Sequence, residues 1–326
     1  MKSLIVLPNS TSNESSVKDA LMGSSMTFRE VTLYGKKIFI TESSAEDEEF
    51  GSITDALILN GGLHSRKVKQ EPTHVQVGNV RIGKGRLVIA AGPCAVESED
   101  QLMEIGENVK KLGADMLRGG AFKPRTTPYT FQGLGKEGVR IMRKVSEATG
   151  LPTVSEIMDI SDYIHFDGSI DMLQIGSRNS QNFSLLKFLG QREVPVLLKN
   201  GMGNTISEWL NSAEYILSGG NGNVVMCYRG VRGFEDGTRF TMDSGAIPVL
   251  MERSHLPICV DPSHPAGNRE YVESLAMAAV AAGTDMLEIE VHNNPDKALS
   301  DAKQQLDFER FSRLIKNVKK LREIMS

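Results

Sequence analysis

Residues Leu117–Gly133 read L-R-G-G-A-F-K-P-R-T-T-P-Y-T-F-Q-G. A short apolar run, Asp115–Gly119, ends here as a predicted buried strand, and a loop rich in cations and hydroxyl groups follows at once. Glycine lets the backbone approach a ligand closely, and proline stiffens the loop. Arginine forks and hydroxyl groups match the oxygens of phosphate and carboxylate. A merely solvated basic loop would need neither the Gly-Gly pair nor the aromatic residues among the charges, so we predict an anion-binding loop.

The order of a short apolar strand, a polar loop and an amphipathic helix repeats along the chain from residue 87 onward. The predicted strands are Leu87–Ala91, Asp115–Gly119, Pro152–Ser155, Met172–Ile175, Val196–Leu198, Asn223–Cys227, Pro257–Val260 and Met286–Ile289. The predicted helices are Glu99–Leu112, Gly135–Thr149, Ile160–His165, Gln181–Leu189, Ile206–Leu217, Gly245–Arg253, Arg269–Ala282 and Phe308–Met325. Eight such units over about 250 residues are typical of an α/β TIM (β/α)8 barrel. A doubly wound sheet is the second choice, because the chain has no dinucleotide-binding fingerprint.

The first 68 residues follow a different pattern. The predicted elements are a strand at Ser3–Leu7, a helix at Ser15–Met22, a hairpin of Phe28–Tyr34 with Lys37–Thr41, and a helix at Ser52–Asn60. This β-α-β-β-α order, with or without a last strand, is typical of a small ferredoxin-like α+β domain. A disordered leader is the alternative, but the apolar alternation argues against it. We therefore predict two domains, residues 1–68 and 69–326.

The bulk composition excludes several classes of partner. The net charge is −4 with an isoelectric point near 5.9, so no basic surplus points to nucleic acid or to an anionic membrane. The opening M-K-S-L-I-V-L-P has too short an apolar run for a signal peptide, and no stretch approaches the ~20 apolar residues of a membrane span. Three cysteines are an odd and sparse set, which favours a reducing cytoplasm.

Polar residues follow the predicted strands, where a TIM barrel builds its active site. Six cations are expected to form an anion site for more than one phosphate or carboxylate: Arg118, Lys123, Arg125, Arg178, Lys199 and Arg229. A thiol, an imidazole and two carboxylates form a candidate metal site: Cys94, His264, Glu290 and Asp301. This set suits Mn²⁺, Fe²⁺, Co²⁺ or Zn²⁺. Singly, each charge could be a salt bridge, but together at one barrel mouth they would be costly unless ligands neutralise them.

Other cysteines and histidines carry weaker signals. Cys227 and Cys259 fall inside predicted strands and are expected to be small buried residues. His255 and His165 are expected at the surface or at helix ends. His292 lies two residues past Glu290 on a predicted strand, so it is kept as a weak site candidate on the same face.

These motifs resemble one enzyme family. G-P-C-A-V-E-S, the R-G-G-A-F-K-P-R-T loop, Q-I-G-S-R-N, D-P-S-H and E-V-H-x-N-P-x-K-A-L-S-D followed by Q-Q-L resemble the 3-deoxy-D-arabino-heptulosonate 7-phosphate (DAHP) synthases. The likeness is strongest to the type Iβ branch, which has a small N-terminal ferredoxin-like domain, and it covers about residues 70 to 306. The related 3-deoxy-octulosonate 8-phosphate synthases carry K-A-N-R-S where this chain has Lys123-Pro124-Arg125-Thr126, which favours the seven-carbon product.

The resemblance implies condensation of phosphoenolpyruvate with erythrose 4-phosphate, the first step of the shikimate pathway. By matching motif, the implied metal ligands are Cys94, His264, Glu290 and Asp301. The implied phosphoenolpyruvate contacts are Arg118, Lys123, Arg178, Lys199 and Arg229, and those for the aldose phosphate are Arg125 and Thr126. Lys123 and Glu156, with His264, are the expected catalytic residues. The resemblance also implies a homotetramer or dimer, and an N-terminal domain that senses an aromatic amino acid or stabilises the oligomer.

The chain departs from the family pattern beside the expected anion site. Asn200 stands where the family has arginine in K-R-G-M, and Tyr228 stands where it has glutamate in E-R-G-I-R-T-F-E. Two alternatives stay open: a synthase that uses another phosphorylated aldose, and a non-catalytic sensor of phosphoenolpyruvate or aromatic amino acids. The intact set of four candidate metal ligands argues against the sensor, since binding alone would not require them.

Overall fold

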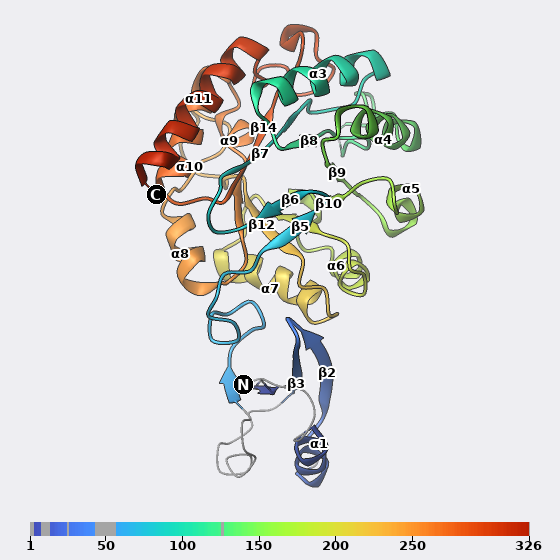
Figure 1. The fold of residues 1–326 in the computed structure, drawn as a ribbon, viewed down its shortest axis with the longest axis vertical. Helices are drawn as coiled ribbons and strands as arrows, with labels where there is room; N and C mark the ends of the chain where they lie inside the picture. Colours follow the sequence, from blue (N-terminus) through green and yellow to red (C-terminus); the bar gives the residue numbers. More distant parts are fainter. Residues whose placement is uncertain (1–2, 8–13, 25, 43–56, 125–126, 326) are drawn as a thin grey trace.

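The computed structural model describes residues 3–7, 14–24, 26–42, 57–124 and 127–325. A closed barrel of parallel strands forms the larger part of the molecule (Figure 1). Its strands follow one another around the ring in chain order. The strands are β7 (Val88–Gly92), β8 (Met116–Arg118), β9 (Thr153–Glu156), β10 (Met172–Ile175), β11 (Val196–Lys199), β12 (Val224–Tyr228), β13 (Ile258–Val260) and β14 (Met286–Glu290). The last strand, β14, pairs with β7 and closes the ring. The predicted TIM barrel is confirmed.

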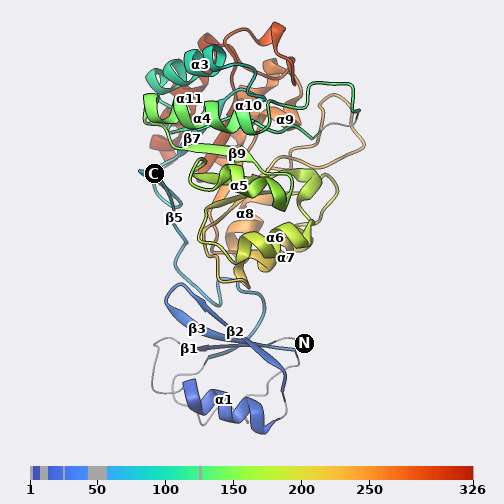
Figure 2. The ribbon, with the colours of Figure 1, turned by 90° about the vertical axis from the view of Figure 1, so that its right-hand side faces the viewer.

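Helices follow the barrel strands, and the longer ones surround the barrel on its outer side (Figures 1 and 2). They are α3 (Glu99–Leu112), α4 (Lys136–Thr149), α5 (Tyr163–Phe166), α6 (Phe183–Gly190), α7 (Ile206–Leu217), α8 (Ala246–Arg253), α9 (Ser263–Ala266), α10 (Arg269–Ala281) and α11 (Phe308–Met325). Local signals set their ends. Thr205 and Glu208 form a capping box at the start of α7, which contributes about 1 kcal/mol. The predicted helix Ile160–His165 is a 3-10 turn, Ile160–Asp162, followed by the four-residue α5.

The side chains on the two faces of each barrel strand pack in different clusters. Outward residues such as Ile89, Leu173 and Leu198 pack against the helices in the main apolar core. Inward residues such as Met116, Met172 and Leu197 fill the barrel interior. Since strand side chains alternate with period 2, the next inward residue along each of these strands also points into the barrel. In several strands that residue is polar, so an apolar layer lies beneath a polar one.

A short hairpin covers the end of the barrel where the strands begin. It consists of β5 (Val75–Val77) and β6 (Val80–Ile82). The hairpin places Val75, Val77 and Ile82 in the same apolar cluster as the inward strand residues. This end is therefore sealed by side chains, and the carboxyl ends of the strands are left to form a site.

The N-terminal residues form a separate antiparallel sheet. Its order is β2 (Phe28–Leu33), β3 (Lys36–Thr41), β1 (Ser3–Leu7) and β4 (Leu57–Asn60), and helix α1 (Glu14–Gly23) lies on the side away from the barrel (Figures 1 and 2). This is the strand order of a ferredoxin-like unit. The predicted helix at Ser52–Asn60 is wrong for its last four residues, which form the edge strand β4 beside β1. Its residues 52–56 lie outside the described residues.

The sheet is joined to the barrel through polar and aromatic contacts at His255. The Tyr34 ring packs edge-on against the His255 ring, with centroids 5.1 Å apart, and the Tyr34 hydroxyl donates to Gly222 O. His255 was predicted at the surface or at a helix end. It lies just after the end of α8, but it is not at the surface, because the side chain is only 1% exposed. The linker after β4 crosses over it and supplies its hydrogen-bond partners, Leu63 and Thr73. His165 is exposed on α5, as predicted. In the described part of the chain, no helix is long and apolar enough to cross a bilayer.

Candidate active site

A polar cavity of about 260 Å³ lies at the carboxyl ends of the barrel strands. Of the residues predicted for the site, it is lined by Arg118, Lys123, Glu156, Arg178, Lys199, Arg229, His264 and Asp301. The barrel brings them together because each ends or follows one of seven parallel strands, with Arg118 and Lys123 both at the end of β8. Arg125 and Thr126 lie outside the described residues. His292 does not line the cavity, since its ring nitrogens contact Gln101 on α3 and the backbone N–H of Asn294.

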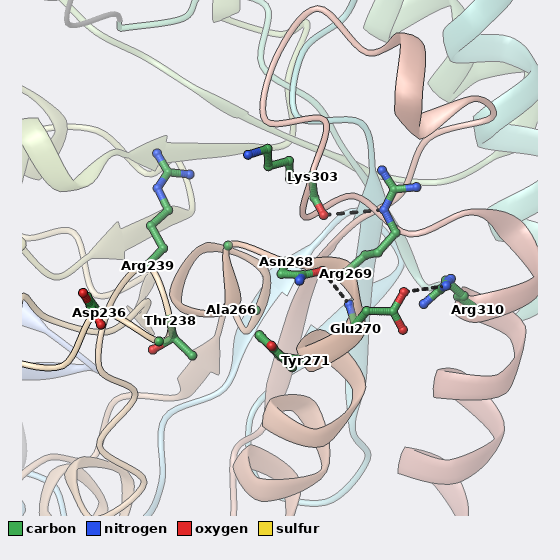
Figure 3. Close-up of a pocket in the computed structure, with 12 residues that line it drawn as sticks. Asp236, Thr238, Arg239, Ala266, Asn268, Arg269, Glu270, Tyr271, Lys303 and Arg310 are labelled. Carbon is green, nitrogen blue, oxygen red and sulfur yellow. Dashed lines mark hydrogen bonds and ion pairs between the residues drawn. The ribbon is translucent and has the colours of Figure 1, made fainter.

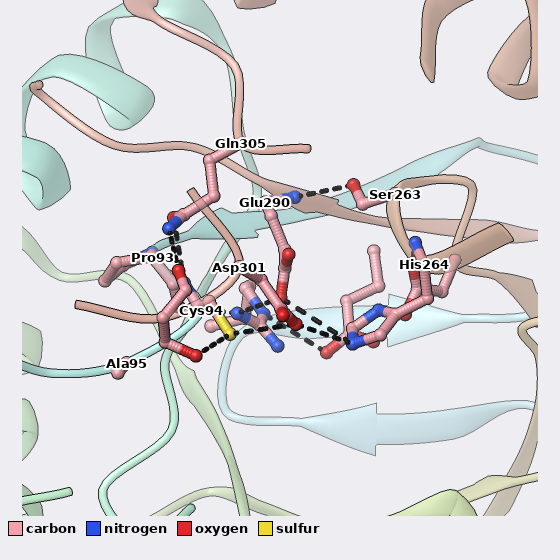
Figure 4. Close-up of polar contacts among 12 residues, drawn as sticks. Pro93, Cys94, Ala95, Ser263, His264, Glu290, Asp301 and Gln305 are labelled. Carbon is pink, nitrogen blue, oxygen red and sulfur yellow. Dashed lines mark hydrogen bonds and ion pairs between the residues drawn. The ribbon is translucent and has the colours of Figure 1, made fainter. Parts of the chain in front are cut away.

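Four candidate ligand groups meet at one side of this cavity (Figure 4). Ligand atoms of Cys94, Glu290 and Asp301 all lie within 4.8 Å of one another. The Nε2 atom of His264 is 3.9 Å from Glu290 Oε1 and 3.8 Å from Asp301 Oδ2. Cys94 follows β7, Glu290 ends β14, and Asp301 has a left-handed backbone with φ of 48°. Asparagine and aspartate tolerate that conformation better than most residues.

The chemistry of this group fits a divalent cation. Glu290 Oε1 is buried and accepts no hydrogen bond, although Arg118 Nη1 lies 3.4 Å away. Burial and the Glu290 carboxylate raise the pKa of the Cys94 thiol to about 12, whereas the pKa of Asp301 is lowered to about 2, because nearby cationic groups outweigh the effect of burial. A divalent cation would satisfy the free carboxylate oxygen and favour the thiolate. Thiol, imidazole and carboxylate groups are ligands for borderline transition metals.

Asp261 fixes the orientation of His264. Its Oδ2 atom lies 2.6 Å from His264 Nδ1, an ion-pair contact without hydrogen-bond geometry, and its Oδ1 atom accepts the His264 backbone N–H at 3.1 Å. Burial alone would raise the pKa of Asp261, but His264 and Lys199 hold it well below its usual range. With Nδ1 facing Asp261, Nε2 is left to face Glu290 and Asp301. An acidic partner behind a histidine is the usual way in which proteins orient an imidazole ligand.

A buried chain of charges lies beneath the cavity. Lys199 Nζ is 2.6 Å from Asp261 and 2.7 Å from Glu288, and Arg118 Nε is 3.3 Å from Glu288. Burial opposes the charge on Lys199, yet these carboxylates raise its pKa well above the ordinary value. Glu288 was not among the predicted site residues. Its position two residues before Glu290 in a strand was the available signal, since both must then point into the barrel.

Arg229 differs from these paired cations. Its Nη1 atom is buried without a hydrogen-bond partner, and its guanidinium lies 3.8 Å from the centre of the Phe240 ring. Burial lowers its pKa to about 10, and the guanidinium stays charged at neutral pH. A buried, charged and partly unsatisfied guanidinium that lines a cavity is suited to an anionic ligand.

The two residues that depart from the family pattern, Asn200 and Tyr228, form hydrogen bonds with nearby backbone groups. Asn200 Oδ1 accepts the backbone N–H of Arg229 at 2.8 Å, and Asn200 Nδ2 donates to Gly230 O at 3.0 Å. Tyr228 points its hydroxyl at the backbone N–H of Asp243, 3.1 Å away. Asn200 therefore ties the end of β11 to the segment that carries Arg229. Neither side chain lines the cavity.

Lys123 and Glu156 face the cavity from neighbouring strands. Lys123 Nζ donates to Cys94 O at 2.9 Å, and the pKa of this lysine is raised, because Cys94 and Glu156 outweigh the effect of burial. The Glu156 carboxylate packs directly on Gly176, where a methyl group would lie only 1.9 Å from Oε1. Glycine is therefore required at residue 176 for Glu156 to keep its place.

A second, more open hollow of about 620 Å³ adjoins the cavity (Figure 3). Arg239 lines both, and its Nη1 atom lies 3.3 Å from Asp301 Oδ1. Two other cations of the hollow have acidic partners: Arg269 pairs with Asp296 and Arg310 pairs with Glu270. Among the described residues, no cation that lines the hollow has a buried nitrogen without a hydrogen-bond partner, as Arg229 does.

Comparisons with known proteins agree with this geometry. Residues 65–326 match the DAHP synthetase I family. The chain belongs to this family. It is 47% identical over 263 residues to a phospho-2-dehydro-3-deoxyheptonate aldolase of Thermotoga maritima, which covers 81% of this chain and 78% of that protein. It is 30% identical over 272 residues to a 2-dehydro-3-deoxyphosphooctonate aldolase of a Geobacter species, which covers 77% of this chain and 98% of that protein.

Solved structures show the same relationship. The crystal structure of the Thermotoga maritima DAHP synthase matches with a TM-score of 0.80 and 39% identity, over 99% of this chain and 98% of that one. A truncated form of the Thermotoga enzyme matches with a TM-score of 0.76 and 44% identity, over 81% of this chain and 97% of that one. The resemblance read from the motifs is confirmed, and the protein is an enzyme of the DAHP synthetase I family.

Proposed function

We propose that this protein is a metal-dependent DAHP synthase, which condenses phosphoenolpyruvate with D-erythrose 4-phosphate to give DAHP and inorganic phosphate. The observation that supports this most strongly is that two sets of residues meet at one cavity. The four candidate metal ligands lie beside a set of cations that converge from different strands. Family membership supplies the reaction class.

Phosphoenolpyruvate carries a phosphate and a carboxylate, and the cavity offers cations for both. Arg229 has a buried Nη1 without a hydrogen-bond partner, and Arg178 lines the same cavity. We assign the phosphate and carboxylate to Arg118, Lys123, Arg178, Lys199 and Arg229. Arg118 and Lys199 are already held by Glu288, which fixes their geometry before substrate arrives. Preorganised cations stabilise charge without reorganising during the reaction.

The second substrate places its aldehyde at Cys94, His264, Glu290 and Asp301. A divalent cation held there would polarise the aldehyde oxygen as a Lewis acid. Arg125 and Thr126 follow Lys123 in the same loop and are assigned to the far phosphate of the aldose. Binding the two phosphates at opposite ends brings the enol carbon and the aldehyde carbon into attack geometry, and such positioning accounts for several kcal/mol of the barrier.

The reaction then needs three proton transfers and a step that restores the proton donor and acceptor. A bond forms between C3 of phosphoenolpyruvate and the aldehyde carbon, and the aldehyde oxygen takes a proton, which we assign to the Lys123 ammonium. Water adds to C2 and gives its proton to the Glu156 carboxylate. The C2–O bond to phosphate then breaks while the C2 hydroxyl gives its proton to the departing phosphate, which releases inorganic phosphate and leaves the ketone. Return of the proton from Glu156 to Lys123 restores both residues. Lys123 and Glu156 both line the cavity, as these roles require.

The test is phosphate release from phosphoenolpyruvate by metal-stripped protein, with and without Mn²⁺, with erythrose 4-phosphate and arabinose 5-phosphate as parallel substrates. We expect release with erythrose 4-phosphate only, restored by the metal. Cys94→Ala should abolish it while thermal unfolding of the metal-free protein stays near wild type. Release with arabinose 5-phosphate alone would move the protein to the eight-carbon reaction. Release with neither would favour the non-catalytic sensor.

Several finer assignments belong to the same proposal. We assign residues 1–68 to a regulatory or oligomerising domain and residues 69–326 to the catalytic barrel, in a cytoplasmic homotetramer or dimer. The metal is Mn²⁺, Fe²⁺, Co²⁺ or Zn²⁺, to be distinguished by the order in which these ions restore activity. Light scattering of the full chain measures the oligomer.

The cleft between the two domains is suited to an aromatic amino acid effector. A cavity of about 940 Å³ lies between the N-terminal sheet and helices α6 and α7. Phe183 and Tyr215 stack at 4.5 Å on its barrel side, and Lys187 lies over the Tyr215 ring. Rings, cations and carboxylates in one cleft suit a zwitterion with an aromatic side chain. Phenylalanine and tyrosine should then inhibit phosphate release, and Phe183→Ala should relieve that inhibition.

A further inference from the structure

Gln304 lies directly behind the candidate metal ligands and is 2% exposed. Its Nε2 atom donates to Glu290 Oε2 at 2.6 Å and to Asp301 Oδ2 at 3.3 Å. Its Oε1 atom accepts from Arg239 Nη1 at 3.0 Å. Every hydrogen bond recorded for this amide therefore goes to a candidate ligand or to the arginine that pairs with one.

The hydrogen bond from Gln304 gives the two oxygens of the Glu290 carboxylate different environments. Oε2 is taken by Gln304, whereas Oε1 faces His264 Nε2 and accepts no hydrogen bond. A carboxylate free to rotate could present either oxygen or both. The amide thus leaves one oxygen of Glu290 for a cation, which favours a single bond from this residue.

The neighbouring residue, Gln305, forms hydrogen bonds near the Cys94 thiol. Its Oε1 atom accepts the backbone N–H of Cys94 at 3.0 Å, and its Nε2 atom donates to Ser300 O at 2.7 Å (Figure 4). The Ser300 hydroxyl lies 3.0 Å from Cys94 Sγ. The segment is anchored to the end of β14, because Leu306 N donates to Glu290 O and His292 N donates to Leu306 O.

We infer that Gln304 is a positioning residue of the metal centre, which selects the oxygens that Glu290 and Asp301 present. The inference rests on the proposed metal site. A carboxamide suits the place, because it donates to two carboxylates and accepts from Arg239 at once. A carboxylate at residue 304 could not donate, and a lysine could not accept. Losing such a partner of metal ligands typically lowers metal affinity 10- to 100-fold.

The experiment uses the full-length protein, stripped of metal and titrated with Co²⁺ as the probe. Affinity is measured by competition with a chromogenic chelator, and ligand geometry by the visible and near-ultraviolet spectrum, which contains a thiolate-to-cobalt band if Cys94 is a ligand. Gln304→Met keeps an unbranched side chain of similar length but removes all three hydrogen bonds. We expect Co²⁺ affinity to fall about 10- to 100-fold, with altered d–d bands. Gln304→Asn, whose amide is one methylene short, should fall in between.

The matched control is Asn221→Leu, which removes another buried amide with three hydrogen bonds, to Leu189 O, Val194 O and Asn223 N. Asn221 precedes β12, at the opposite end of the barrel strands from the metal ligands. This variant should lower thermal stability without changing Co²⁺ affinity, whereas Gln304→Met should change affinity even in protein that unfolds at the wild-type temperature. If Gln304→Met fails to fold, Gln304→Asn decides by the same readouts.

The possible results separate this inference from the metal site itself. If wild type binds no Co²⁺, or if Cys94→Ser leaves the thiolate-to-cobalt band unchanged, the metal site is wrong and the inference falls with it. If wild type binds Co²⁺ with a thiolate band but Gln304→Met matches it within about twofold and with the same spectrum, only the positioning role is refuted.

Discussion

His255 should make this protein less stable as pH falls from 7 to 5. Its Nε2 atom lies 2.8 Å from Leu63 O, which can only accept, so Nε2 carries the proton and Nδ1 accepts from the Thr73 hydroxyl at 2.9 Å. A second proton, on Nδ1, would require the Thr73 hydroxyl to turn from donor to acceptor. Burial, with Lys69, His64 and Arg66 adding positive charge nearby, lowers the pKa of His255 from 6.5 to about 4.

The sign and size follow from linkage. Above pH 6.5 the imidazole is neutral in both states, and the full contribution to stability is present. Between pH 6.5 and 4 the unfolded chain binds a proton that the folded chain does not, so unfolding becomes easier as pH falls. A drop in pKa from 6.5 to about 4 corresponds to a loss of about 2 kcal/mol between pH 7 and pH 5.

The assay is urea unfolding at pH 7, 6 and 5, followed by the fluorescence of the single tryptophan, Trp209. His255→Gln keeps a donor for Leu63 O but cannot be protonated in this range, so it should lose about 2 kcal/mol less than wild type on going to pH 5. His165→Gln, on the exposed face of α5, serves as the control and should follow wild type. Parallel losses in wild type and His255→Gln would refute the reasoning.

Three further predictions concern the cavity. Arg229→Gln should raise KM for phosphoenolpyruvate about 10- to 100-fold, because a charge-assisted hydrogen bond of about 1.5–3 kcal/mol is lost, and an unchanged KM in steady-state kinetics would remove this arginine from the site. Asn200→Ala should lower the free energy of unfolding by about 1–3 kcal/mol in urea and raise the same KM, since the Arg229 N–H is left buried without its acceptor; a change in neither quantity would contradict this. Gly176→Ala should lower kcat at least about 10-fold, because the new methyl group displaces Glu156. Gly203→Ala is the control and should leave kcat unchanged, since no atom lies within 4 Å of its new methyl group. Equal rates in the two variants would count against the role of Glu156.

The barrel could be predicted because its signals are local and repeated. Strand Met172–Ile175 and helices Glu99–Leu112, Ile206–Leu217 and Phe308–Met325 have the predicted bounds, since apolar periodicity and capping residues act within one element. The edge strand β4 could not be separated from a helix in this way. Leu57–Asn60 is short and apolar, and only its pairing with Ser3–Val6 of β1 makes it a strand.

In the site, too, residue types could be predicted from the sequence, whereas contacts between distant segments could not. Cys94, His264, Glu290 and Asp301 were grouped from their residue types and motifs, and the fold brings them within a few ångströms of one another. Gln304 was part of a quoted motif, but nothing in its sequence position indicates which carboxylate oxygen it contacts. That choice depends on side-chain directions from two separate segments.

The sequence alone determined the alternation of strands and helices in the barrel, the residue types at each strand end and the family to which the chain belongs, because periodicity and motifs are properties of neighbouring residues. Only the tertiary structure decided which charges are already paired. Lys199 and Arg118 are held by Glu288, whereas Arg229 keeps a buried nitrogen without a partner. It also decided that His255 is buried under the linker from the N-terminal sheet. Pairing and burial depend on contacts between residues far apart in the chain, and closure of the barrel brings those residues together.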